Sequence, residues 1–114
     1  MLCSQIALSG YSIMWLYVMF DLPTDTKGHR REATIFRKRL LEDGFVMYQF
    51  SVYIRSCPSL ESTEVHVKRI KRLVPKEGLV SILKVTDRQY GDTINIFGGG
   101  GKELPTKYEQ MEFL

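Results

Sequence analysis

The stretch LYVMFDLPTDT, residues 16–26, decides the fold. Its apolar first half is typical of a buried strand, and the run ends at one carboxylate, Asp21, just before the turn around Pro23. Aspartate is rare inside strands. At the end of one it is either a turn former or helix cap, or a ligand for a metal ion or phosphate. We predict a first strand over residues 13–20, and the remaining sequence favours the ligand role for Asp21.

The segment after this turn has the pattern of an amphipathic helix. Thr24 or Thr26 can cap its start, and Gly44 can end it. Ile35 and Leu41 fall outside the apolar face, so they are candidate contacts with another chain. The apolar face itself is formed by Ala33, Phe36 and Leu40.

Residues 45–55 alternate in character with a period of two, as a strand does. This is long for one strand, so a bend at residues 49–51 would divide it into two antiparallel strands. Pro58 and Ser59 then open a second helix, and residues 79–86 form a strand that we expect to be buried on most of its surface. The apolar face of the second helix is formed by Leu60, Val67, Ile70 and Val74.

The resulting order, β-α-β-β-α-β, predicts an α+β, ferredoxin-like fold with two helices on one face of an antiparallel sheet. We expect this domain to span residues 14–97, including an edge strand at residues 88–97. Residues 98–114 would form a glycine linker and a short strand, with Met111 and Phe113, that is exchanged with a partner subunit. Residues 1–13 would be an upstream extension, either a loose arm or a start-site artefact.

The chain has 114 residues, enough for one domain, so a large active site must be shared between subunits. Cys3 and Cys57 are too few for a disulfide framework and lack the neighbours that zinc needs, which indicates reduced thiols in the cytoplasm. Residues 1–20 carry no charge, but polar residues interrupt them and no basic segment precedes them. This pattern argues against a membrane span or a signal peptide.

Basic residues gather in two clusters, although the formal net charge is only +3. Such clusters suggest a polyanionic partner, and the ordinary alternative is a solvated helix surface. Contacts from helix faces to phosphates would be independent of nucleic-acid sequence and sensitive to salt. The first predicted helix carries Lys27, Arg30, Arg31, Arg37 and Lys38, and the second carries Lys68, Arg69 and Arg72.

Three segments in this order and spacing resemble the CRISPR-associated Cas2 family: the strand ending at Asp21, QFSVY at residues 49–53, and VTDRQY at residues 85–90. The resemblance covers residues 14–114, and the QFSVY stretch and the tail are similar to members found beside type II effector systems. It implies a homodimer of ferredoxin-like subunits that bridges two dimers of the CRISPR integrase, the first Cas protein. It also implies, as in several relatives, a metal-dependent endonuclease activity on RNA or DNA.

Carried over by position, the resemblance implies that Asp21 is the catalytic residue and a ligand of Mg²⁺ or Mn²⁺. It further implies that Arg30 and Arg31 are among the basic nucleic-acid contacts, and that Ser51 and Tyr53 lie near the dimer interface.

One carboxylate alone provides few ligands for Mg²⁺, which prefers six oxygen ligands in octahedral geometry. A two-fold axis near Asp21 would bring two carboxylates together, and a cation would relieve their repulsion. No histidine lies in the first predicted strand, so we expect slow hydrolysis at best. The alternative role for Asp21 is a structural cap or turn residue.

These features favour a homodimeric adaptor in CRISPR spacer acquisition that binds double-stranded DNA and has weak nuclease activity. The alternative is a metal-dependent endoribonuclease for single-stranded RNA, similar to the toxin-like VapD ribonucleases. A third class is a regulatory module for a small molecule, for which no motif is present. Tyr48, Phe50 and Tyr53 could form a base-stacking platform, but packing in the core or in a dimer is the favoured interpretation.

Overall fold

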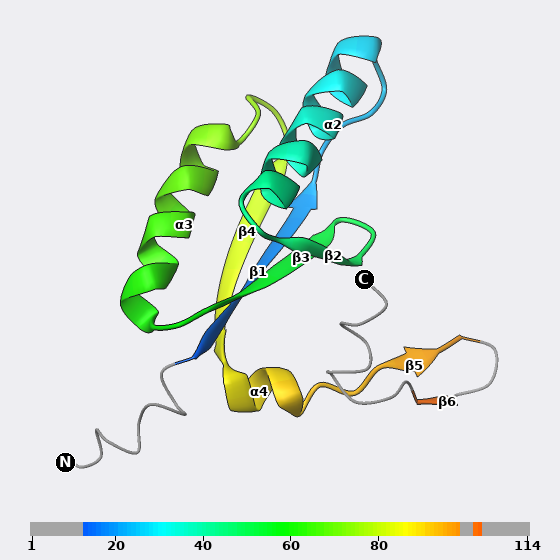
Figure 1. The fold of residues 1–114 in the computed structure, drawn as a ribbon. Helices are drawn as coiled ribbons and strands as arrows, with labels where there is room; N and C mark the ends of the chain where they lie inside the picture. Colours follow the sequence, from blue (N-terminus) through cyan, green and yellow to red (C-terminus); the bar gives the residue numbers. More distant parts are fainter. Residues whose placement is uncertain (1–12, 99–101, 104–114) are drawn as a thin grey trace.

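The computed structural model describes residues 13–98 and 102–103 (Figure 1). The first six elements have the predicted order β-α-β-β-α-β. The helices and strands are β1 Met14–Asp21, α2 Lys27–Glu42, β2 Val46–Gln49, β3 Val52–Cys57, α3 Leu60–Leu73, β4 Leu79–Thr86, α4 Asp87–Gly91, β5 Ile96–Phe97 and β6 Lys102–Glu103.

Strand β1 lies in the middle of a four-stranded antiparallel sheet of order β2-β3-β1-β4, and α2 and α3 cover one face of it (Figure 1). This arrangement confirms the ferredoxin-like α+β prediction. Because strand side chains alternate between faces, Leu16, Val18 and Phe20 point toward the helices and are buried. The other face of β1 carries Trp15, Tyr17, Met19 and Asp21.

The core forms between the sheet and the two helices. On α2 the predicted face is confirmed, since Ala33, Phe36 and Leu40 are all buried. On α3 the prediction is only partly right: Ile70 is buried, but Leu60 is 54% exposed and Thr63 is buried instead. The hydroxyl of Thr63 donates a hydrogen bond to the carbonyl of Leu60, which lets a polar residue occupy the core side of this helix.

The turns follow the local sequence signals. Thr26, not Thr24, caps α2 by accepting a hydrogen bond from the amide of His29, and Ser59 forms a reciprocal capping box with Ser62 at the start of α3. The predicted bend divides residues 45–55 into β2 and β3, and Ser51 in that bend has a φ of 93°.

Two expectations about the last third of the domain are wrong. Strand β4 is not mostly buried, because it is an edge strand with one covered face, and Leu79 and Leu83 are 66% and 48% exposed. Residues 88–97 are not an edge strand of the main sheet. Thr86 and Gln89 form a capping box that starts helix α4, and only β5 follows, paired with β6 in a separate two-stranded sheet.

Helix α4 covers part of the sheet face that α2 and α3 leave open. The ring of Tyr90 stacks on Trp15 with centroids 3.8 Å apart, and the indole nitrogen of Trp15 donates to Asp87 at 2.8 Å. The hydroxyl of Tyr48 donates to Asn95 at 2.7 Å and extends this cover. Helix α4 therefore covers this face of the sheet at the end of β1 where Trp15 lies.

The predicted upstream extension and the exchanged tail strand with Met111 and Phe113 lie outside the described residues, apart from Ile13, and the domain boundaries stay predictions. Among the helices that the structure describes, none has the length and apolarity needed to cross a membrane.

Candidate functional site

Asp21 is the last residue of β1 and is exposed on the open face of the sheet. It pairs with Leu79 of β4, whereas the pairing of β1 with β3 ends at Met19 and Val52. The side of Asp21 away from β4 is thus not occupied by a paired strand residue. A shallow pocket of about 310 Å³ lies beside Asp21, lined by Met19, Phe20, Asp21, Ser51, Val52, Leu79 and Ser81.

The backbone around Asp21 is held from two directions. On one side the amide of Phe20 donates to the carbonyl of Ser51 at 3.0 Å. On the other side Gly78 has a φ of +106°, and a Cβ at this position would lie 2.8 Å from the carbonyl oxygen of Asp21. A glycine is therefore required for the turn before β4 to approach the end of β1 this closely.

The loop after Asp21 is fixed by His29. Its Nδ1 lies 2.6 Å from Asp25 of the loop, and its Nε2 lies 3.0 Å from Glu77 of the turn before β4. Only a doubly protonated imidazole can donate to both carboxylates. The hydrogen bond with Asp25 raises the pKa of His29 above its ordinary value, and the same bond lowers the pKa of Asp25.

The oxygen-bearing side chains of the pocket are one carboxylate, Asp21, and two hydroxyls, Ser51 and Ser81. Within residues 13–98, no group of three or more His, Cys, Asp or Glu side chains is arranged to hold a metal ion. Among the described residues, this pocket thus offers Mg²⁺ a single charged ligand, fewer than the ion prefers.

The predicted basic residues of α2 differ in their surroundings. Arg30 donates to the carbonyl of Thr24 at 3.1 Å, so it also holds the loop after Asp21. Arg37 is half-buried, with its guanidinium 5.5 Å from the ring centroid of Phe20 and 5.1 Å from that of Phe50. The remaining members of this cluster, Lys27, Arg31 and Lys38, are exposed.

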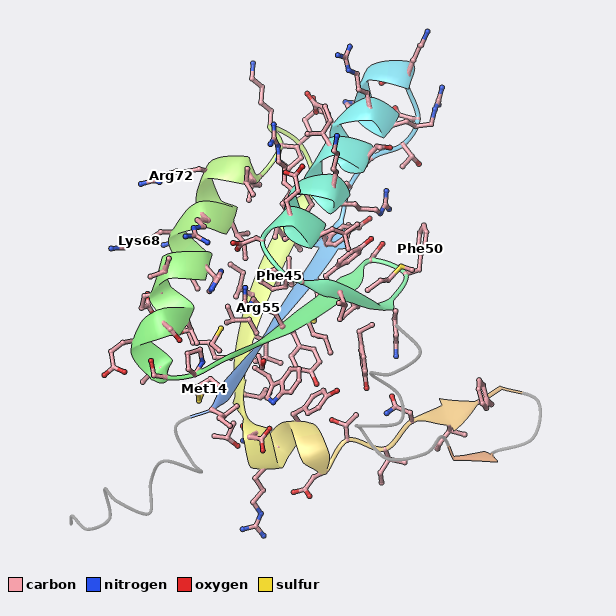
Figure 2. All side chains as sticks on the ribbon, in the orientation of Figure 1. Met14, Phe45, Phe50, Arg55, Lys68 and Arg72 are labelled. Carbon is pink, nitrogen blue, oxygen red and sulfur yellow. The ribbon has the colours of Figure 1, made fainter. Side chains whose placement is uncertain are left out.

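The second cluster of basic residues lies on α3. Figure 2 shows Lys68 and Arg72 projecting from α3 on the side of the molecule away from Phe50. Arg69 pairs with Asp43 at 2.6 Å, where His66 also contacts this carboxylate at 2.7 Å. Arg69 therefore connects α3 to the end of α2, and its predicted contact with nucleic acid stays a prediction.

The two predicted dimer contacts in the β2–β3 region also lie in different places. Ser51 lines the pocket beside Asp21, whereas Tyr53 is only 4% exposed and belongs to the core. Their roles in a dimer stay predictions.

A sequence model for the family described as CRISPR associated protein Cas2 matches residues 14–93, which include Asp21, the β2–β3 bend and α4. The chain belongs to the Cas2 family. This family places the chain in the CRISPR system, in agreement with the resemblance found in the sequence.

The chain is similar to curated Cas2 relatives over most of its length, and each of the three described below is named CRISPR-associated endoribonuclease Cas2. The relative from Flavobacterium psychrophilum is 44% identical over 92% of this chain and 91% of its own length. The relative from Parvibaculum lavamentivorans is 50% identical over 82% of this chain and 92% of its own length. The relative from Ligilactobacillus salivarius is 40% identical over 89% of this chain and all of its own length.

Several residues around the Cas2 site were not found by sequence reasoning. The roles of His29, Gly78 and Ser81 come from contacts with distant segments, which no local sequence pattern indicates. Ser51 belonged to the QFSVY stretch, but the sequence did not indicate that it lies beside Asp21.

Proposed function

We propose that this Cas2 protein is a homodimeric adaptor in CRISPR spacer acquisition, with a weak Mg²⁺-dependent nuclease activity centred on Asp21. The observation that carries this proposal is the position of Asp21. It is exposed on the open sheet face beside apolar side chains, among them Leu79 at 66% exposure. A second copy packed on this face would bury the apolar surface and bring a second Asp21 near the first.

In such a dimer, the two Asp21 carboxylates would hold Mg²⁺ or Mn²⁺, which supplies charge stabilisation at the scissile phosphate and an activated water. The hydroxyls of Ser51 and Ser81 line the same pocket and can donate hydrogen bonds to phosphate oxygens. His29 is engaged by two carboxylates and is not placed as a general base. This shortage of proton acceptors supports slow hydrolysis.

The adaptor role rests on phosphate contacts. Lys27, Arg31 and Lys38 are exposed on α2 and form no ion pair with another described residue, so they can neutralise the phosphates of double-stranded DNA. The two-fold symmetry of the adaptor would present the same surface twice, which allows it to bridge two integrase dimers.

The second candidate is an endoribonuclease for single-stranded RNA. The names of the relatives favour it, since each is described as an endoribonuclease. The exposed ring of Phe50 near the pocket also suits an unpaired base better than a duplex.

Asp21→Ala and Asp21→Asn separate these roles. We expect Mg²⁺-dependent cleavage of RNA and DNA to fall by roughly 100-fold or more, because Asp21 is the only charged side chain that lines the pocket among the described residues. Integration of spacers in a reconstituted reaction should persist if the adaptor role is primary, and should disappear with cleavage if nuclease chemistry is required. Asp92→Asn, which neutralises a carboxylate distant in sequence and exposed beyond α4, is the matched control.

Cleavage that is unchanged in both Asp21 variants would contradict the nuclease assignment. A wild-type protein that sediments as a monomer at working concentration, with and without the integrase, would contradict the dimeric site and the adaptor together.

A further inference from the structure

Phe50 is the most exposed large hydrophobic side chain in the described part of the chain, with 78% of its surface accessible. It lies in the bend between β2 and β3, and Figure 2 shows its ring projecting away from the sheet. A single exposed aromatic residue is not unusual. The surroundings of this one, however, hold it in a fixed place.

The ring of Phe50 is supported by Arg37. The guanidinium lies 5.1 Å from the Phe50 centroid and 5.5 Å from the centroid of the buried Phe20, which is within the range of cation–π attraction. Arg37 thus connects the exposed ring to the core of the domain, while the large exposed fraction leaves most of the ring accessible to a second planar group.

The bend itself is held against the end of β1. Ser51, the next residue, has a φ of 93°, a conformation that is unfavourable for a residue other than glycine. Its carbonyl accepts the hydrogen bond from Phe20, the residue before Asp21. Because Ser51 and Asp21 line the same pocket, the exposed ring is carried by a segment that also forms the candidate site.

We propose that Phe50, supported by Arg37, is a stacking platform for an unpaired nucleobase and that it positions the adjoining phosphate beside Asp21. Aromatic and arginine planes are the groups on which proteins stack single-stranded bases, and this stacking tolerates any base. Phe50 is then a positioning residue that favours unpaired over paired nucleotides. This inference rests on the proposed function, because it assumes a nucleic-acid substrate at Asp21.

The test measures binding of a ten-nucleotide single-stranded RNA that contains 2-aminopurine, whose fluorescence is quenched by stacking. We expect Phe50→Ala to weaken binding by about 5- to 150-fold and to abolish the quenching, and Phe50→Trp to retain both. Val65→Ala, which removes another exposed apolar side chain from a position on α3, should change neither. An oligonucleotide with an abasic residue at the probe position should bind wild type as weakly as Phe50→Ala binds the intact RNA. The abasic change should add nothing in the Phe50→Ala variant.

Unchanged binding in Phe50→Ala, or fully additive effects of the variant and the abasic residue, would overturn the platform. So would a loss of binding that follows only from dissociation of the dimer in sedimentation, since Phe50 would then be a subunit contact. The experiments distinguish a failure of the platform from a failure of the proposed function. If Asp21→Ala abolishes cleavage while Phe50→Ala binds normally, the nuclease stands and the platform falls. Quenching that requires Phe50 in a protein that cleaves nothing supports the platform without the nuclease.

Discussion

The two ends of β1 have different surroundings, although Trp15 and Asp21 lie on the same face of this strand. At the first end, α4 covers the sheet: Tyr90 stacks on Trp15 and is itself 2% exposed. At the other end, Asp21 opens into a pocket, with exposed Leu79 beside it. Helix α4 covers one end, whereas none of the described helices covers the other.

This difference indicates which substitutions in β1 should affect folding and which should affect function. The closed end carries an aromatic stack and a hydrogen bond from Trp15 to Asp87, so substitutions there should act on folding. The open end carries an exposed carboxylate with no hydrogen-bond partner among the described residues, so its removal should cost little folding free energy. A functional role predicts such a residue: the fold does not need its side chain, while contacts on both sides position its backbone.

The largest effect on stability is expected for Trp15→Ala. It removes the stack on Tyr90 and leaves a cavity under α4, so we expect the free energy of unfolding to fall by about 3 kcal/mol. Asp21→Ala should change it by less than about 0.5 kcal/mol. Urea denaturation of the two variants measures both values.

Trp15→Phe is the matched control for the closed end, because it keeps an aromatic ring on Tyr90 and loses only the hydrogen bond to Asp87. Its free energy of unfolding should lie between those of wild type and Trp15→Ala. If Asp21→Ala destabilised the protein as much as Trp15→Ala, the division between a structural end and a functional end would be wrong.

A smaller effect is expected at the turn that supports Asp21. Gly78→Ala places a Cβ 2.8 Å from the carbonyl oxygen of Asp21 at a positive φ, so we expect a loss of about 1–3 kcal/mol in unfolding free energy. Cleavage should fall as well, because the end of β1 must move. Gly28→Ala is the control: its Cβ would meet nothing closer than 3.9 Å, and alanine should stabilise α2 by up to about 1 kcal/mol. Equal effects of the two substitutions would show that the contact with Asp21 is unimportant.

The features that sequence predicted are the local ones. The spacing of Ala33, Phe36 and Leu40 defines one helix face regardless of what packs on it, and Asp21 ends its strand because of its immediate neighbours. Helix α4 was missed although its capping pair, Thr86 and Gln89, is readable in the sequence. The prediction of an edge strand over residues 88–97 overlooked this local signal for a helix.

The remaining features depend on which segments meet. An apolar run such as that of β4 is compatible with a central or an edge strand, and only the sheet order makes Leu79 exposed. Likewise, the sequence places Arg37 on a basic helix face, whereas in the fold its guanidinium lies over two aromatic rings, those of Phe20 and Phe50. The environment of a long charged side chain is set by tertiary contacts that no local pattern encodes.

The smallest effect is expected from pH, through the contact that closes the loop after Asp21. His29 has a pKa raised chiefly by its hydrogen bond with Asp25, with Glu77 and Glu32 adding attraction. The stabilisation is therefore fully present below the ordinary pKa of histidine, about 6.5, and is lost as pH rises through the higher folded value. Asp25 has a lowered pKa, so its contribution is present above the ordinary pKa of aspartate and is lost as pH falls. An NMR titration of His29 should show the raised pKa directly.

Asp25→Asn removes the main cause of this shift, so the pKa of His29 should return toward 6.5 in the variant. The urea midpoint of wild type should decrease slightly from pH 6 to pH 8.5, and the midpoint of Asp25→Asn should decrease less. Glu77→Gln should have a weaker effect than Asp25→Asn, because its attraction is a minor cause of the shift. If all three proteins lost stability equally over this range, the loop after Asp21 would not be held by His29. The open end of β1 would then owe its geometry to Gly78, Ser51 and Arg30.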